Sequence, residues 1–161
     1  MYVSEVETCR DMLKHLGIAT EWGRKTQHLL RCDYFGVNDD CRVIVEQKST
    51  KNDLERAIPQ IFRYYHQFFR LKWCKTPNVP MKLFIYYCIP DSKYTIRSLV
   101  VAKEFFAEYA QLYQKYMRNY DVPAINFCFD NKNDSITIYS DGVENIISDG
   151  NTINGKRLRK K

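Results

Sequence analysis

The sequence predicts an α/β protein in which helices flank a mixed central β-sheet, in the order α-β-β-α-β-α-β-β. Three observations support this fold class: a hairpin pattern between Thr26 and Ser49, a nearly continuous apolar run over Lys82–Ile89, and two long segments with helical periodicity. Such an apolar run is typical of a strand buried on both faces. Because it follows a strand and a helix, a right-handed crossover should place it parallel to the second strand of the hairpin.

The first element is a helix over residues 5–16. Ser4 and Glu7, three residues later, form a capping box, and Gly17 is a typical helix stop. Glu5 lies on the side of this helix that carries the apolar residues. Residues 18–25 predict a connector, with a short strand as an alternative.

The hairpin that follows joins a first strand, Thr26–Phe35, to a second strand, Arg42–Ser49. A two-residue turn, which is a common hairpin connection, would pair Val37 with Asp40. This turn determines the register of the two strands.

The register decides which face of the hairpin Asp33 joins. With the two-residue turn, Asp33 lies opposite Ile44 and diagonal to Glu46, on the face that also carries Lys48. Diagonal neighbours are roughly 7–8 Å apart, so two carboxylates in these positions can share one ion. A slip of one residue would move Asp33 to the other face.

An amphipathic helix is predicted from Asn52 to about Trp73, with Pro59 introducing a kink near its start. Its apolar residues recur at helical spacing and should pack on the sheet. The opposite face carries a polar stripe of Arg56, Gln60, Arg63, Tyr64, Gln67 and Arg70. The arginines are seven residues apart and therefore nearly in line, which favours a phosphate-contacting face over a merely solvated one.

A second long helix is predicted from Thr95 to Tyr120, followed by a hairpin of Ala124–Phe129 and Ser135–Tyr139 and by a short strand, Val143–Ile147. A stripe of tyrosines on this helix predicts core packing, with a base-stacking platform or a homodimer interface as alternatives; it consists of Tyr109, Tyr113, Tyr116 and Tyr120. We expect one domain over residues 1–150 and a basic, disordered tail over residues 151–161.

Three motifs occur in order along these elements: Asp33, then Glu46-Gln47-Lys48, then Gln60 and Tyr64 in the pattern Q-x-x-x-Y. Together they resemble the PD-(D/E)XK nuclease superfamily, and the last motif resembles its RecB-like branch. The chain departs from the family pattern at Cys32, where the family name has proline, and at Gln47.

The resemblance implies a restriction-endonuclease-like core and an Mg²⁺-dependent endonuclease, with Mn²⁺ as a substitute ion. It implies that Asp33, Glu46 and the backbone carbonyl of Gln47 hold the metal, and that Lys48 activates or orients the attacking water. Gln60 and Tyr64 would then position Lys48 or the scissile strand.

Many members of the family bring a further acid from their first helix, and Glu5 is the candidate for this role. Glu21 in the connector is the alternative extra acid. Glu5 can also be interpreted as a solvated first-turn glutamate that interacts with the helix dipole.

The net charge of +6 is unevenly distributed along the chain. Residues 48–75 contain seven basic and two acidic residues, whereas residues 121–155 contain six acidic and one basic residue. A basic side beside an acidic side predicts an oriented polyanion partner, so we expect nucleic acid, with DNA favoured over RNA, to contact Arg56, Arg63 and Arg70. The competing prediction is a non-catalytic nucleic-acid-binding protein on a degenerate nuclease fold.

No apolar run approaches the roughly 20 residues that span a membrane, and no signal-peptide core is present, so we expect no membrane partner. The six cysteines form no C-x-x-C pair, which favours reduced core thiols. These observations predict a cytoplasmic protein, with the nucleus as an alternative in a eukaryote.

Overall fold

The computed structural model describes residues 2–71, 76–89, 95–118, 122–130, 136–140, 143–147, 151–153 and 156–158. The helices in this part of the chain are α1 (Tyr2–His15), α2 (Arg24–Leu30), α3 (Lys51–Phe68) and α4 (Ile96–Arg118). The strands are β1 (Glu21–Trp22), β2 (Tyr34–Val37), β3 (Arg42–Lys48), β4 (Met81–Tyr87), β5 (Ile125–Asp130), β6 (Ile136–Ser140), β7 (Val143–Ile147), β8 (Asn151–Ile153) and β9 (Lys156–Leu158).

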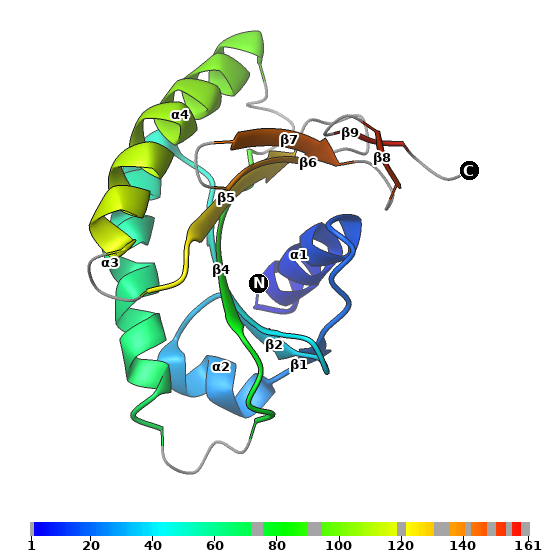
Figure 1. Ribbon diagram of the computed structural model, residues 1–161, viewed down its shortest axis with the longest axis vertical. Coiled ribbons are helices and arrows are strands. Elements are labelled where there is room, and N and C mark those ends of the chain that lie inside the picture. The colour runs from blue at the N-terminus through cyan, green and yellow to red at the C-terminus, as the bar shows by residue number, and fades with distance from the viewer. Residues whose placement is uncertain are drawn as a thin grey trace.

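The strands join one mixed sheet in the order β1-β2-β3-β4-β5-β6-β7-β9-β8. The central strands β3, β4 and β5 are parallel, while β2 and β6 pair antiparallel to their inner neighbours. The predicted α/β class and the parallel crossover from β3 through α3 to β4 are therefore confirmed. Figure 1 shows α3 and α4 on one side of the sheet and α1 on the other.

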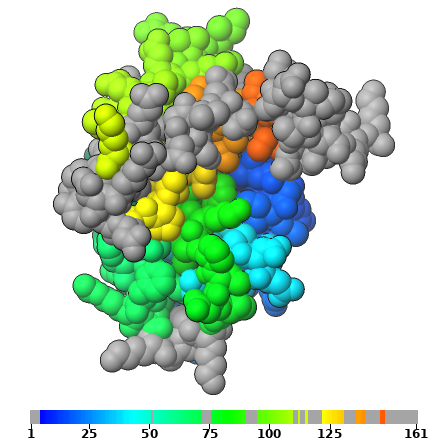
Figure 2. Space-filling model, viewed as in Figure 1, coloured from blue at the N-terminus to red at the C-terminus, as the bar shows by residue number. Residues whose placement is uncertain are grey.

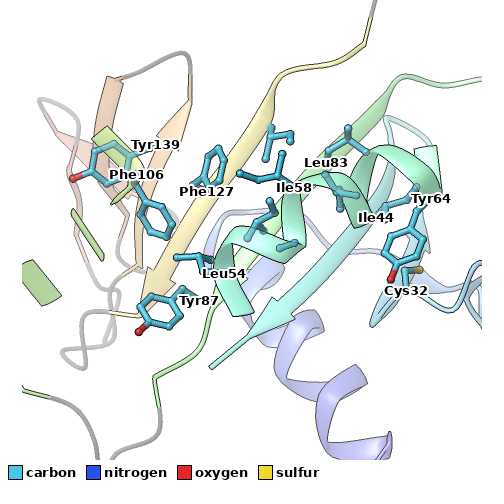
Figure 3. Close-up of a cluster of buried hydrophobic side chains, with 14 of the residues drawn as sticks. Cys32, Ile44, Leu54, Ile58, Tyr64, Leu83, Tyr87, Phe106, Phe127 and Tyr139 are labelled. Atoms are coloured by element: carbon cyan, nitrogen blue, oxygen red, sulfur yellow. The ribbon is translucent and has the colours of Figure 1, made fainter. Parts of the chain in front are cut away.

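The sheet separates two hydrophobic clusters, and β3 contributes to both because its side chains alternate. Ile44 belongs to the cluster beneath α3 and α4, whereas Val43 and Val45 belong to the cluster beneath α1. Figure 3 shows the first cluster, with Tyr64 near one end and Tyr139 near the other. In the same view with all atoms drawn, the blue atoms of the N-terminal part of the chain lie beside the green atoms of β4 (Figure 2). Glu46 and Lys48 continue the side of β3 that carries Ile44.

The first predicted strand, Thr26–Phe35, is wrong over most of its length. Arg24–Leu30 form α2, and only the last two residues of the predicted strand belong to β2. Within α2, Thr26 and Leu30 are buried and lie four residues apart, which is the spacing of one helix face. The helical period therefore prevailed over the two-residue period of a strand.

The predicted two-residue turn is also wrong. Val37 pairs with Arg42, and the turn between them is held by Asn38. The side-chain oxygen of Asn38 accepts hydrogen bonds from the main-chain N–H groups of Asp40 (2.7 Å) and Cys41 (2.8 Å). This capping by an asparagine side chain stabilises a turn that is longer than the predicted one.

The longer turn shifts the register by two residues from the prediction. Phe35 lies opposite Ile44, so continuing the same register places Asp33 opposite Glu46. An even shift leaves every side chain on its predicted face. The predicted face of Asp33 is therefore retained, although its predicted partner is not.

Helix α3 begins after Thr50, whose side chain caps the main-chain N–H of Asp53 at 3.3 Å, and it includes Pro59. It ends at Phe68, so Arg70 lies in a turn beyond the helix and not on its polar stripe. The predicted end near residue 73 lies outside the described residues.

The C-terminal half follows the predicted order. Helix α4, the β5–β6 hairpin and β7 lie where the sequence predicts them. Of the tyrosine stripe, Tyr109 packs against Phe105 in a stacked arrangement, while the side chains at positions 113, 116 and 120 lie outside the described residues. Core packing at Tyr109 agrees with the prediction for that position.

The segment 151–161, for which the sequence analysis expects a disordered tail, contains the strands β8 and β9. Ile153 pairs with Lys156, and the two residues between them in the sequence are Asn-Gly. This dipeptide is the strongest short hairpin signal and was not used in the prediction.

The described cysteines at positions 9, 32, 41 and 128 are buried and form no disulfide, as predicted for core thiols, whereas Cys88 is half-buried. Cys74 lies outside the described residues. No helix in the described ranges is long and apolar enough to span a membrane.

Candidate active site

The candidate site lies where β3 ends and where the chain enters β2. Asp33 lies in the bend that precedes β2, while Glu46 and Lys48 lie at the end of β3, on the face that α3 covers. Helix α3 follows directly after β3 and returns over the same face of the sheet. The structure therefore brings together Asp33, Glu46 and Lys48, which the sequence analysis selects.

Asp33 is anchored to the end of β3. Its Oδ2 atom accepts a hydrogen bond from the main-chain N–H of Gln47 at 2.7 Å. In a strand, the N–H and C=O groups of one residue point to the same edge. The carbonyl of Gln47 therefore points toward the edge that Asp33 occupies.

Glu46 is the most deeply buried acid of the site, with 3% of its surface exposed. Burial, followed by the neighbouring Asp33 carboxyl, raises the pKa of Glu46 from the ordinary value of 4.5 to about 8, although Lys48 acts in the opposite direction. Its Oε1 atom is buried and has no hydrogen-bond partner within the described part of the chain. An orphan carboxylate oxygen of this kind is unfavourable unless a proton or a cation compensates it.

The second carboxylate oxygen of Glu46 has two partners. Lys48 Nζ lies 3.3 Å from Oε2, and the hydroxyl group of Tyr64 donates to the same oxygen at 3.3 Å. Burial raises the pKa of the Tyr64 hydroxyl, with further contributions from the charges of Glu46 and Asp33. Tyr64 therefore stays protonated and acts as a hydrogen-bond donor.

The position of Tyr64 corrects the prediction for α3. The sequence analysis assigns Tyr64 to the polar stripe, but its side chain is buried against the sheet and reaches Glu46. A signal was available, because Tyr64 lies seven residues after Ala57 and four before Phe68, both of which belong to the apolar face.

Gln60, one turn before Tyr64, is half-buried. Its Oε1 atom is buried without a hydrogen-bond partner in the described part of the chain. The Q-x-x-x-Y pair therefore divides into a tyrosine that contacts the carboxylate cluster and a glutamine whose carbonyl oxygen is available to a ligand.

Of the two proposed extra acids, the structure brings Glu5 to the site. Burial raises the pKa of Glu5, and the charge of the neighbouring Asp33 raises it further. Glu21 lies in β1, exposed, and pairs with Val37 at the outer edge of the sheet. Glu21 is thus not among the residues that line the pocket beside Asp33.

Only two of the three arginines in the predicted phosphate-contacting stripe lie on α3. Arg56 and Arg63 are exposed on α3, two turns apart, whereas Arg70 lies past the end of the helix. The guanidinium group of Arg63 lies 5.5 Å from the centre of the Tyr64 ring. Arg63 is therefore the arginine of this stripe that is closest to the carboxylate cluster through a described contact.

Within the described ranges, no group of three or more His, Cys, Asp or Glu side chains converges as a metal centre. The candidate donors are fewer: the Asp33 and Glu46 carboxylates and the carbonyl of Gln47. Their chemistry fits a hard divalent cation, which prefers carboxylate and carbonyl oxygens. The buried, unpartnered Oε1 atom of Glu46 and its raised pKa are the observations that support this fit.

A basic surface that the sequence analysis missed borders the same site. The pocket beside Asp33 has a volume of about 540 Å³ and is also lined by Arg24, His28 and Arg31 from α2 and its end. The sequence analysis places Arg24 in a connector and His28 and Arg31 in a strand, and these elements give the three residues no common face. Their spacing of four and three residues is the signal that indicates one face of a helix.

Comparisons with known proteins found no matching family model, no matching curated protein and no matching solved structure. The chemistry of the site is therefore argued from its own geometry.

Proposed function

We propose that the protein is a metal-dependent nuclease with a restriction-endonuclease-like core, which hydrolyses phosphodiester bonds in nucleic acid, with DNA favoured over RNA. The observation that carries the proposal is the proximity of the two acids at the end of β3, where Asp33 Oδ2 accepts from the main-chain N–H of Gln47 at 2.7 Å and Lys48 Nζ lies 3.3 Å from Glu46 Oε2. Two carboxylates and an ammonium group at the end of one strand provide the groups that metal-assisted hydrolysis of a phosphodiester requires.

The arrangement of elements supports the same proposal. The hairpin β2–β3 carries the carboxylates, α3 covers them, and β4 returns parallel to β3, in the order that the resemblance to the PD-(D/E)XK superfamily implies. The hydrogen bond from Tyr64 to Glu46 gives the Q-x-x-x-Y motif a physical role, since it holds one carboxylate oxygen and leaves the other free.

Asp33, Glu46 and the carbonyl of Gln47 would hold Mg²⁺, with Mn²⁺ as a substitute. A bound divalent ion supplies a more acidic water and neutralises the charge that develops on the phosphate. Lys48 orients the attacking water through one of its donors and places positive charge beside the phosphate. Tyr64 fixes the orientation of the Glu46 carboxylate, and is in this respect a positioning residue.

The proposal is tested by incubating the protein with single-stranded, duplex and branched DNA and with RNA, in Mg²⁺, in Mn²⁺ and in EDTA. We expect cleavage that depends on the divalent ion. The variant Lys48→Ala should lose about 10²–10⁴-fold or more in cleavage rate while retaining substrate binding, because its charge acts mainly in the transition state. Lys82→Ala is the matched control, since Lys82 is exposed at the other end of the parallel strand pair.

Thermal unfolding of both lysine variants establishes that they are folded before activities are compared. A wild-type protein that binds these nucleic acids but cleaves none of them in Mg²⁺ or Mn²⁺ would support the non-catalytic alternative. Cleavage that is unchanged in Lys48→Ala would contradict the proposed role of this lysine.

A further inference from the structure

We propose that α2 and its two ends form a groove that leads one single strand of nucleic acid to the Asp33–Glu46 pair, and that Arg31 binds a phosphate of that strand. This inference rests on the proposed function, because it names the form of the substrate and the surface that receives it. It replaces the predicted arginine stripe of α3 as the main route of the strand, with Arg63 as the point where the two surfaces meet.

The first observation is the charge of α2. Residues 23–31 contain Arg24, Lys25 and Arg31 together with His28, and no acidic residue. Arg24, His28 and Arg31 are exposed and follow one another at intervals of four and three residues, so they share one side of the helix. A row of cations on one helix face is the electrostatic feature that follows a phosphate backbone.

The second observation is that this row and two of the acids line one groove. The pocket of about 540 Å³ is lined by Arg24, His28 and Arg31 and also by Glu5 of α1 and by Asp33. Figure 1 shows α2 beside β1 and β2. A polyanion is attracted to the basic residues of this groove, and Asp33, one of the acids that would hold the metal, lines the same groove.

The third observation concerns the position of Arg31. It ends α2 with a left-handed backbone, φ 62°, which is unusual for a residue with a side chain. Its N–H donates to the carbonyl oxygen of Gln27 at 2.9 Å, and the Gln27 side chain donates to the carbonyl of Cys32 at 2.8 Å. These bonds fix Arg31 two residues before Asp33, so the guanidinium group has a defined base from which to reach a phosphate.

Arg31 also connects the groove to α3. A second hollow of about 270 Å³ is lined by Arg31, Leu29 and Arg63. Arg63 lies over Tyr64, which donates to Glu46. One arginine at the end of α2 and one on α3 therefore line the same hollow, which is an arrangement that can hold two successive phosphates.

The dimensions of the groove favour a single strand. A volume of about 540 Å³ is within the range of pockets that take small ligands, so it matches one or two nucleotides better than a base-paired duplex. The Trp22 ring lines the same groove, and Leu29 is 44% exposed beside it. Apolar and aromatic surface next to cations is typical of sites that bind unpaired bases without reading their sequence.

The test measures binding in EDTA, where metal-dependent cleavage does not interfere. Fluorescently labelled single-stranded DNA, single-stranded RNA and blunt duplex DNA of equal length are titrated with wild type, with Arg24→Gln/Arg31→Gln and with the charge-matched control Lys82→Gln. Lys82 is exposed and lies outside the groove. Anisotropy is recorded over a range of salt concentrations, and unfolding curves establish that each variant is folded.

We expect wild type to bind single strands at least tenfold more tightly than the duplex. The double variant should lose at least tenfold in affinity for single strands, and its salt slope should fall by about 1.4, that is about 0.7 for each lost phosphate contact. Lys82→Gln should match wild type in both respects. A preference between the DNA and RNA strands then identifies the natural strand.

Equal affinity and equal salt slope in wild type and the double variant would overturn the groove, as would a wild type that binds no nucleic acid. Equal binding of duplex and single strands would overturn the single-strand assignment. These outcomes are separate from the proposed function. Expected binding without cleavage in Mg²⁺ or Mn²⁺ would refute the nuclease and leave the groove standing, whereas cleavage with an unchanged KM in the double variant would refute the groove alone.

Discussion

The raised pKa of Glu46 makes the stability of the metal-free protein depend on pH. The folded state raises the pKa of this carboxyl from 4.5 to about 8, so between these values the folded state binds a proton that the unfolded state has released. Stability therefore falls as the pH rises through this interval. At about 1.4 kcal/mol per pH unit, the loss is on the order of 4–5 kcal/mol.

The substitution Glu46→Gln isolates this effect. Glutamine has the shape of the protonated acid and keeps an oxygen that can accept from Lys48 and Tyr64. In EDTA, the variant should be about as stable as wild type near pH 4.5 and more stable by about 4–5 kcal/mol above pH 8. Denaturant unfolding of both proteins at several pH values between 4 and 9 measures the difference directly.

Addition of Mg²⁺ extends the same experiment. An ion that binds the folded state at one hundred times its Kd stabilises it by about 2.7 kcal/mol. Wild type at pH 8 should gain this stability, and Glu46→Gln should gain little, because it lacks the charged oxygen. A stability difference between the two proteins that stays constant from pH 4.5 to pH 8 would refute the assignment of the raised pKa to Glu46.

Three further predictions follow from single contacts. Tyr64→Phe should lower the free energy of unfolding by about 1–3 kcal/mol at pH 9, where Glu46 is mostly ionised and loses a donor, and an unchanged denaturation midpoint would contradict this contact. Gly36→Ala should lower it by about 1–3 kcal/mol, because the added Cβ would meet two hydroxyl oxygens at 2.6 Å; a variant as stable as wild type would refute this close packing. If α3 contacts phosphates, Arg63→Gln should reduce the salt slope for single-strand binding by about 0.7, and Arg56→Gln, which lies farther from Glu46, should reduce it by less. Anisotropy titrations measure these slopes. Equal slopes in wild type and both variants would exclude α3 from the interface.

The central part of the fold could be predicted because its signals are local and agree with one another. The continuous apolar run of β4, the period-two pattern of β3 and the amphipathic pattern of α3 each select one type of element. The handedness rule for crossovers then fixes their parallel arrangement. Even the incorrect turn did not move Asp33 to the other face, since the error was two residues and side chains alternate with a period of two.

The errors occurred where one short pattern fits two structures. Thr26 and Leu30 fit a strand by composition and a helix by spacing, and burial against the sheet and α3 decided for the helix. The Asn38 turn depends on a side-chain oxygen that bonds two main-chain N–H groups, which the strand pattern does not encode. The polar hydroxyl group of Tyr64 suggests the polar stripe of α3, although the position of Tyr64 in the helix is on the buried, apolar face.

The basic row of α2 was missed for a related reason. Arg24, His28 and Arg31 share a face only if the segment is helical, so an error in secondary structure concealed a functional surface. The grouping of Asp33 and Glu46 was predicted correctly. It requires only that any error in the register of β2 and β3 is an even number of residues, which keeps both side chains on one face. Predictions of a site are thus as secure as the least certain element that contributes a residue to it.

The carboxylate cluster itself links stability to function. Three acids, Glu5, Asp33 and Glu46, interact around one described ammonium group, that of Lys48, so the folded protein must neutralise the excess charge in another way. A proton does so below about pH 8, and on the proposed function a divalent ion does so at the same oxygens. The two compete, because a ligand carboxylate has to be deprotonated before it binds a metal. The metal affinity of wild type should therefore rise between pH 6 and pH 8, and Glu46→Gln should bind weakly at every pH in this interval, which calorimetric titration with Mg²⁺ or Mn²⁺ can measure. A wild-type affinity that does not change with pH would mean that the ion does not displace the proton of Glu46.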